Sequence, residues 1–306
     1  MRHRNDGAPV MAGSGRFGTV LTAMVTPFDD DGALDLDAAA ALARWLVDNG
    51  SDGLVIAGST GEASTLTDDE KRDLWRAVVD AVTVPVVAGS TSNDTAHSVH
   101  LTKAATDAGV AGILGVGPYY NRPSQAGLEA HFRAVAAATD LPVLIYDIPI
   151  RTGRKISNDV LVRLAREVDN IVGIKDATLD VGSSARLMAA APDGFELYSG
   201  NDDQTLCLLA LGCCGLIGVA THWAAKEFGE MITSFHKGDV DAARRMNERL
   251  LESCDFESSN DAPNPVPTKA LLRTLGLKVG ECRLPMGPTP PGLEDRAREV
   301  LANLRG

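Results

Sequence analysis

The sequence has few aromatic residues and few cysteines, and it contains no long hydrophobic run. Phe, Trp and Tyr make up 5% of the 306 residues, and the five cysteines form neither a CxxC pair nor another metal-binding spacing. We therefore expect the cysteines to be small buried residues of a protein in a reducing cytoplasm. No window approaches the roughly 18 apolar residues of a membrane-spanning helix, so no membrane partner is predicted.

Positive charge is also scarce. The 29 Lys and Arg residues are outnumbered by 41 Asp and Glu residues, which gives a formal net charge of −12. Nucleic-acid-binding proteins usually present a basic face, so this class of partner is disfavoured. The first residues, MRHRNDGAPVMAGSGRFG, carry arginine but lack the apolar segment of a signal peptide. We expect residues 1–16 to form a flexible leader.

The sequence does contain a regular alternation of short hydrophobic runs and helical patterns. Buried strands that alternate with helices pair in parallel, and eight such units favour a closed (β/α)8 barrel over an open sheet. We predict this barrel for residues 17–235. Only helical patterns follow, so residues 236–306 are predicted to form a C-terminal helical extension. The eight hydrophobic runs are 20–28, 53–60, 84–91, 112–120, 141–149, 171–178, 195–202 and 215–222.

In a (β/α)8 barrel the active site forms at the carboxyl ends of the strands. Lys175 is the strongest candidate there, because it follows the hydrophobic run 171–174 with no turn residue between. Alternate strand residues point inward, so Lys175 shares its face with Gly173, which leaves room for a long side chain. Burial that lowered the pKa to about 7.5 would make about a quarter of the amine neutral at pH 7, compared with about 0.04% for an ordinary lysine. Such an amine can form a Schiff base with a carbonyl substrate.

Other interpretations of Lys175 and its neighbours remain open on the pattern alone. Lys175 could instead reach solvent or pair with Asp176. Ser59 and Thr60 lie in a glycine-flanked turn that can hold a carboxylate, or they form a simple strand-to-helix turn.

Two tyrosines and an arginine complete the predicted mouth. Tyr120 and Tyr146 can transfer protons near a reactive amine, or they can simply bond to backbone carbonyls. Arg151 can bind a carboxylate with two parallel hydrogen bonds, although the pattern alone favours a solvated loop arginine.

No cofactor motif accompanies these residues. His97 and His100 lie one turn apart on an expected outer helix, and no Asp or Glu completes a plausible metal site with them. We therefore expect them at the surface and predict no metal site. The stretch GILGVG lacks the spacing of a dinucleotide-binding fingerprint. The seventh and eighth runs end in SGND and GVATH, which offer no obvious phosphate-binding group.

Several motifs together resemble the family of pyruvate-dependent class I aldolases that contains dihydrodipicolinate synthase and N-acetylneuraminate lyase. They are GSTGE, GPYYNRPSQ, YDIPIRTG, IVGIKDAT, YSGND and NPVPTKALL, and the resemblance extends from GTVLTAMVTPF to CRLPMGP. It implies condensation of pyruvate with L-aspartate 4-semialdehyde on the route to diaminopimelate and lysine, in the cytoplasm and without a metal or organic cofactor. Cleavage of a 2-keto-3-deoxy sugar acid or N-acetylneuraminate is the alternative activity. A barrel that binds an acidic small molecule without catalysis is the alternative of another class.

The resemblance also implies roles for individual residues. Lys175 forms the imine with pyruvate, and Tyr146 transfers protons at the imine and the aldehyde. Ser59 and Tyr120 complete a proton relay, with Tyr120 reaching the site of a neighbouring subunit in a homo-oligomer, a tetramer.

Four further residues are implied in substrate binding. Thr60 holds the pyruvate carboxylate, while Gly200 and Ile217 line the site through their backbones. Arg151 binds the carboxyl end of the aldehyde, which favours the synthases over the sugar-acid lyases.

The sequence departs from the family pattern in two places. Ser59 stands where synthases generally carry threonine, but serine keeps the hydroxyl. Lysine-inhibited relatives use an interface pocket to which Asn93 and Tyr119 correspond, and His97 occupies the position of an expected acidic residue. We therefore predict weak or absent inhibition by lysine.

Overall fold

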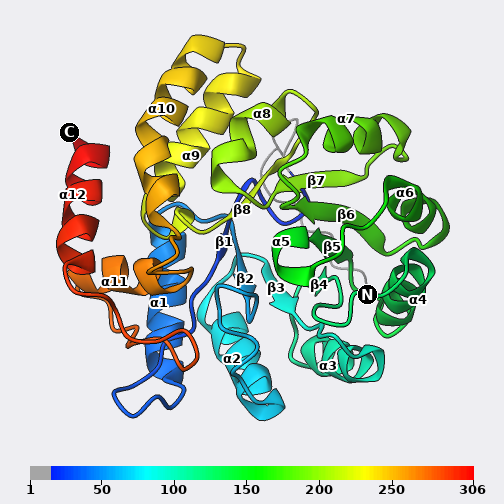
Figure 1. Ribbon diagram of the computed structural model, residues 1–306, viewed down its shortest axis with the longest axis horizontal. Coiled ribbons are helices and arrows are strands. Elements are labelled where there is room, and N and C mark those ends of the chain that lie inside the picture. The colour runs from blue at the N-terminus through cyan, green and yellow to red at the C-terminus, as the bar shows by residue number, and fades with distance from the viewer. Residues whose placement is uncertain (1–14) are drawn as a thin grey trace.

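Eight parallel strands close into a barrel in sequence order in the computed structural model, which describes residues 15–306 (Figure 1). This confirms the predicted (β/α)8 barrel, whereas residues 1–14 of the predicted leader lie outside the described residues. The strands are β1 (Val20–Ala23), β2 (Gly53–Ile56), β3 (Val86–Gly89), β4 (Gly112–Val116), β5 (Val143–Asp147), β6 (Ile171–Asp176), β7 (Glu196–Ser199) and β8 (Gly215–Gly218).

Each strand stops before the end of the hydrophobic run that predicted it. β1 ends at Ala23, yet Met24, Val25 and Phe28 in the following loop are also buried. The loops at the carboxyl ends therefore fold inward over the strands and contribute to the core. A run of apolar residues indicates which residues are buried, and the buried residues continue beyond the last residue that pairs in the sheet.

Most of the helices form a ring around the barrel. They are α1 (Leu36–Asp48), α2 (Asp68–Ala81), α3 (Thr95–Asp107), α4 (Gln125–Ala136), α6 (Asn158–Glu167), α7 (Val181–Ala190), α8 (Thr205–Leu209) and α9 (Thr221–His236). The short α5 (Pro149–Thr152) lies instead over the barrel near the centre of Figure 1, and the 3-10 turn η1 (Asp202–Gln204) precedes α8.

The helix starts follow local capping chemistry. Thr67 and Glu70 form the capping box that their spacing predicts at the start of α2. The Glu70 N–H donates to Thr67 Oγ1 at 3.2 Å, and the Thr67 N–H donates to a Glu70 carboxylate oxygen at 2.8 Å. The capping box thus satisfies two backbone donors at this helix end without tertiary contacts.

The barrel separates two apolar cores. Residues such as Leu21, Val55 and Leu144 point into the lumen, whereas Leu54 and Ile145 pack outward against the helices.

Cys213 and Cys214 are buried, as expected, but Cys207 is exposed, so the prediction of buried cysteines is wrong at that position. Across residues 15–306, no helix has both the length and the apolar character that crossing a bilayer requires.

The chain after α9 forms α10 (Val240–Phe256), α11 (Val266–Thr274) and α12 (Leu293–Arg305), which stack on the α1 and α9 side of the barrel (Figure 1).

An ion pair inside the protein joins this extension to the loop after β2. Lys269 Nζ lies 2.8 Å from Glu62 Oε1, and each side chain is 1% exposed. Lys269 also donates to the Glu281 carbonyl at 3.0 Å and lies 4.2 Å from the centre of the Phe28 ring. The pair therefore has additional polar and cation–π partners, as a buried charge requires.

We expect Lys269→Met to lower the free energy of unfolding by about 3–5 kcal/mol, because it leaves the Glu62 carboxylate buried without its cation. Chemical denaturation would measure the loss. The exposed pair of Arg298 and Asp295 on α12 provides the control, and Arg298→Met should cost less than about 1 kcal/mol. Equal losses in the two variants would contradict the role assigned to the buried pair.

Candidate active site

Lys175 lies on β6 with its side chain directed into the barrel. It is 4% exposed, and the sheet register places it between Tyr146 on β5 and Tyr198 on β7. Glycine at position 200 is required there, because a Cβ would lie 3.0 Å from Lys175 Cγ and 2.9 Å from the Asp176 carbonyl oxygen. The lysine stem therefore occupies space that Gly200 leaves free.

The two alternative interpretations of Lys175 do not fit this geometry. The side chain is too buried to reach solvent, and no ion pair joins it to Asp176 among the described residues. Asp176 is the next residue along the strand, so its side chain points outward. There it accepts hydrogen bonds from Ser184 Oγ at 2.5 Å and from the Thr178 N–H at 2.9 Å.

Burial changes the acid–base behaviour of Lys175. Removal from water lowers its pKa to about 8, the carboxyl groups of Asp202 and Glu257 oppose the shift, and Arg151 adds to it. At pH 7 about a tenth of an amine with this pKa is neutral. Lys175 can therefore act as a nucleophile at neutral pH while most of it still carries a proton.

A buried carboxyl pair lies near this amine, and sequence reasoning missed it. Asp202 accepts hydrogen bonds from the N–H groups of Val219 (2.9 Å) and Ala220 (2.8 Å), and Glu257 accepts from Ala220 at 3.2 Å. Burial raises the pKa of both acids. A hydrogen bond between them opposes the rise at Asp202 and adds to the rise at Glu257. The SGND motif contains Asp202, but nothing in the sequence around Glu257 indicates its partner.

Tyr146 is the phenol that accompanies Lys175 at the mouth. Lys175 Nζ lies 4.6 Å from the centre of its ring. Burial raises the pKa of Tyr146 to about 12, against smaller lowering effects from Arg151 and from a hydrogen bond with Ser59. Tyr198 also neighbours Lys175 in the register, but its hydroxyl donates to the Gly18 carbonyl at 3.1 Å, next to the start of β1. Tyr198 is therefore held at the amino-terminal end of the barrel.

A cavity of about 390 Å³ opens above these residues. Four of the predicted site residues, Ser59, Tyr120, Tyr146 and Arg151, are among the side chains that line it. Lys175, Thr60, Gly200 and Ile217 are not among those lining residues, and Lys175 meets the cavity through its contact with the Tyr146 ring. A phenol, a hydroxyl and a guanidinium thus line one space, and the buried amine lies against the ring of that phenol.

The remaining predicted residues lie at the same carboxyl ends. Thr60 is buried, and its hydroxyl accepts a hydrogen bond from the Asn264 side-chain amide at 3.0 Å. Asn264 belongs to the C-terminal extension, so that segment reaches the site, a contact that the strand pattern did not indicate. Ile217 on β8 is buried in the inner core, and the Gly200 N–H donates to the Asp176 carbonyl at 2.7 Å.

Tyr120 differs from all the others because it is 89% exposed. Its φ of +72° lies in the left-handed region that a bulky residue rarely adopts. This large aromatic side chain is therefore held in the open at the rim of the cavity that it lines. Across residues 15–306, no group of three or more His, Cys, Asp or Glu side chains is arranged to hold a metal ion.

The closed barrel and the buried lysine at its mouth define a (β/α)8 barrel whose site is suited to carbonyl chemistry. The sequence profile of the dihydrodipicolinate synthetase family matches residues 16–303. The chain belongs to this family.

Individual relatives agree with the family assignment. A 4-hydroxy-tetrahydrodipicolinate synthase from Acidothermus cellulolyticus is 50% identical over 94% of this chain and 91% of its own length. One from Mycolicibacterium paratuberculosis is 48% identical over 95% of each chain. Crystal structures of dihydrodipicolinate synthases are similar throughout: that from Bacillus anthracis has a TM-score of 0.90 at 42% identity, covering 94% of this chain and 98% of its own. That from Cyanidioschyzon merolae, with lysine bound, has a TM-score of 0.91 at 40% identity, covering 95% and 99%.

We expect imine formation at Lys175 to accelerate as pH rises through about 8 and then to level off, because the neutral amine is the reactive form and its pKa is lowered to about 8. Rapid quenching with borohydride after mixing with pyruvate would measure the initial rate at each pH. The amine of Nα-acetyl-lysine serves as the control, since its rate should rise until about pH 10. A protein profile that follows the control would contradict the lowered pKa.

Proposed function

We propose that this protein condenses pyruvate with L-aspartate 4-semialdehyde to give 4-hydroxy-tetrahydrodipicolinate, in lysine and diaminopimelate biosynthesis. The observation that carries the proposal is the buried Lys175 amine beside the Tyr146 ring, under a cavity that Arg151 also lines. The family assignment and the relatives named 4-hydroxy-tetrahydrodipicolinate synthase support the same activity.

The reaction begins with the neutral amine of Lys175. It attacks the ketone of pyruvate, and loss of water gives an imine. Loss of a methyl proton converts the imine to an enamine, whose carbon attacks the aldehyde and forms the new carbon–carbon bond. The amine of the condensed product then attacks the imine carbon, closes the ring and releases Lys175. Asp202 and Glu257 favour the protonated form of the Lys175 nitrogen, and the same interaction would stabilise the protonated imine.

Proton transfers in this scheme pass through hydroxyl groups. Tyr146 exchanges protons with the imine and with the alkoxide that forms from the aldehyde, and Ser59 is its hydrogen-bond partner. Tyr120 completes the relay in the site of a neighbouring subunit, and its exposure supports this assignment. The active form is accordingly a homo-oligomer, a tetramer.

Different groups bind the two substrates: neutral hydroxyl and backbone groups bind pyruvate, and a charged guanidinium binds the aldehyde. Thr60 and the backbone around it hold the pyruvate carboxylate, with Gly200 and Ile217 lining the site through their backbones. Arg151 binds the carboxyl end of the aldehyde, where its planar guanidinium can form two parallel hydrogen bonds. The reaction requires no metal or organic cofactor, and the protein acts in the cytoplasm.

Borohydride trapping with pyruvate, followed by peptide mapping by mass spectrometry, tests the lysine assignment. The adduct should lie on Lys175 and disappear in Lys175→Met. A non-catalytic binding barrel would give no adduct.

A coupled assay separates the synthase from a sugar-acid lyase. The wild-type protein should turn over pyruvate with L-aspartate 4-semialdehyde and not cleave N-acetylneuraminate. Arg151→Ala should lower kcat/KM for the aldehyde by about 100-fold, because it removes a charge-assisted bidentate contact worth about 3 kcal/mol. Borohydride should still trap pyruvate on Lys175 in Arg151→Ala, although more slowly near neutral pH, because Arg151 no longer helps to lower the pKa of Lys175. Complete loss of the adduct would contradict the role assigned to this arginine.

We also expect weak or absent inhibition by lysine. The Asp68 carboxylate is already bonded to His97 at 2.9 Å, and Lys71, which lines the cavity, carries an ammonium group of its own. The ammonium group of a lysine effector would therefore find no free carboxylate at Asp68, His97 or Lys71. Activity should persist at millimolar lysine. The synthase from Cyanidioschyzon merolae, whose structure holds lysine, is the comparison protein in the binding measurement. Half-inhibition of this protein by millimolar lysine at pH 8 would refute the expectation.

A further inference from the structure

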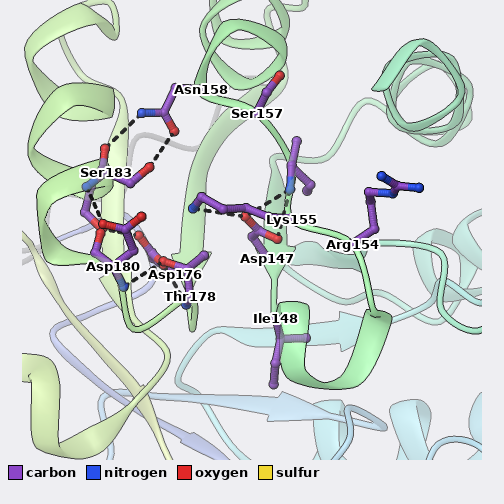
Figure 2. Close-up of polar contacts among 12 residues, drawn as sticks. Asp147, Ile148, Arg154, Lys155, Ser157, Asn158, Asp176, Thr178, Asp180 and Ser183 are labelled. Carbon is purple, nitrogen blue, oxygen red and sulfur yellow. Dashed lines mark hydrogen bonds and ion pairs between the residues drawn. The ribbon is translucent and has the colours of Figure 1, made fainter. Parts of the chain in front are cut away.

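A buried carboxylate at the start of the segment that carries Arg151 bonds to the backbone near the end of the same segment. It runs from Ile148 to Ser157, between β5 and α6, and includes α5. Asp147, the last residue of β5, precedes it, and Asp147 is 1% exposed. Both carboxylate oxygens of Asp147 accept from the Ile156 N–H at 3.3 Å, and Lys155 Nζ lies 3.9 Å away. Figure 2 shows Lys155 extended toward Asp147 across the base of this segment.

Other contacts hold the outer edge of the same segment. Gln125 donates to the Lys155 carbonyl at 2.8 Å and accepts from the Ser157 N–H at 2.8 Å. Arg122 donates to the Gly153 carbonyl at 2.9 Å. All of these are bonds between exposed or partly buried groups, whereas Asp147 holds the segment from inside the protein.

Two charged groups act on Asp147. Lys155 comes from the segment itself, and Asp176 faces Asp147 across the β5–β6 register. Asp176 has its own partners, Thr178 in the loop after β6 and Ser184 in the first turn of α7 (Figure 2 labels Thr178). The two carboxylates therefore serve different loops: Asp147 holds the one with Arg151, and Asp176 holds the next.

We propose that Asp147 is a positioning residue that keeps Arg151 in place for the aldehyde substrate, and that it does so best when its carboxyl group is ionised. The ionised carboxylate accepts a charge-assisted hydrogen bond from the Ile156 N–H and attracts the Lys155 ammonium as an ion pair. Protonation weakens the hydrogen bond and removes the charge attraction. This inference rests on the proposed function of Arg151, and it adds a pH dependence to that function.

The direction of the pH effect follows from the surroundings of Asp147. Burial raises its pKa to about 7, Lys155 and the Ile156 N–H oppose the shift, and Asp176 adds to it. As pH falls through about 7, Asp147 takes up a proton and its hold on the segment weakens. KM for the aldehyde should therefore rise as the pH falls through about 7. The kinetics with pyruvate instead follow the pKa of Lys175, which is about 8, and should not depend on Asp147.

The experiment measures both KM values from pH 6 to pH 9 in the full-length protein. In the wild type, KM for L-aspartate 4-semialdehyde should be about fivefold higher at the acidic end, the ratio expected when charge-assisted bonds become neutral. Asp147→Asn keeps the shape and an acceptor oxygen but cannot change its charge. Its KM for the aldehyde should stay flat across this range, whereas its KM for pyruvate should follow the same pH profile as in the wild type, because that profile depends on Lys175.

Two further variants move the transition in opposite directions. Lys155→Met removes the cation that lowers the pKa of Asp147, so the rise in KM should shift to higher pH. Asp176→Asn is the matched control, the same change one strand away, and removal of its negative charge should shift the rise to lower pH. These two variants also carry the test if Asp147→Asn does not fold.

Each result separates this inference from the proposed function. A pyruvate adduct in the wild type, together with a KM for the aldehyde that follows the same pH profile in wild type and Asp147→Asn, would overturn the inference alone. Shifts in the same direction for Lys155→Met and Asp176→Asn would also overturn it. No pyruvate adduct in the wild type would overturn both.

Discussion

The removal of one ammonium group from water is the constraint on which the site depends. Lys175 is buried in the barrel, and burial would disfavour its charged form far more without the carboxyl pair of Asp202 and Glu257. The pair raises the pKa of Lys175 while burial lowers it, and the balance of about 8 leaves the amine reactive near neutral pH. A more hydrophobic surrounding would make the amine neutral but would also destabilise the protonated imine that it must form.

Because strand residues point alternately inward and outward, the reactive side chains and the side chains that hold the loops lie on opposite faces of the barrel wall. Tyr146 and Lys175 point into the lumen, and the residues that follow them, Asp147 and Asp176, point outward. The outward carboxylates accept from the loops after their strands, so each strand end supplies one reactive side chain and the group that fixes the adjacent loop. The same arrangement can form at the carboxyl end of any strand in which a residue that points into the lumen is followed by a polar residue.

The fold and the reactive face were predictable because both depend on local patterns. Strand runs, the capping box at Thr67 and the position of Lys175 after a buried run all act within a few residues. The partners that complete the site act over long distances: Asn264 bonds to Thr60 across 204 positions, and Glu257 meets Asp202 only when α10 packs on the barrel. No periodicity encodes such contacts. The exposure of Cys207 was also missed, because a small apolar residue on a helix has no signal for the face it occupies.

The C-terminal extension is part of the site for the same reason. Its segments contribute Glu257 beside Asp202, Asn264 against the Thr60 hydroxyl and Lys269 against Glu62 in the loop after β2. These contacts fall on the loops after β2 and β7, at the carboxyl ends where the reaction would occur. Without the extension, Glu62 would lose the cation that pairs with it and Asp202 would lose its carboxyl partner. The family match extends to residue 303, and the contacts provide a physical reason why the extension and the barrel form one functional unit.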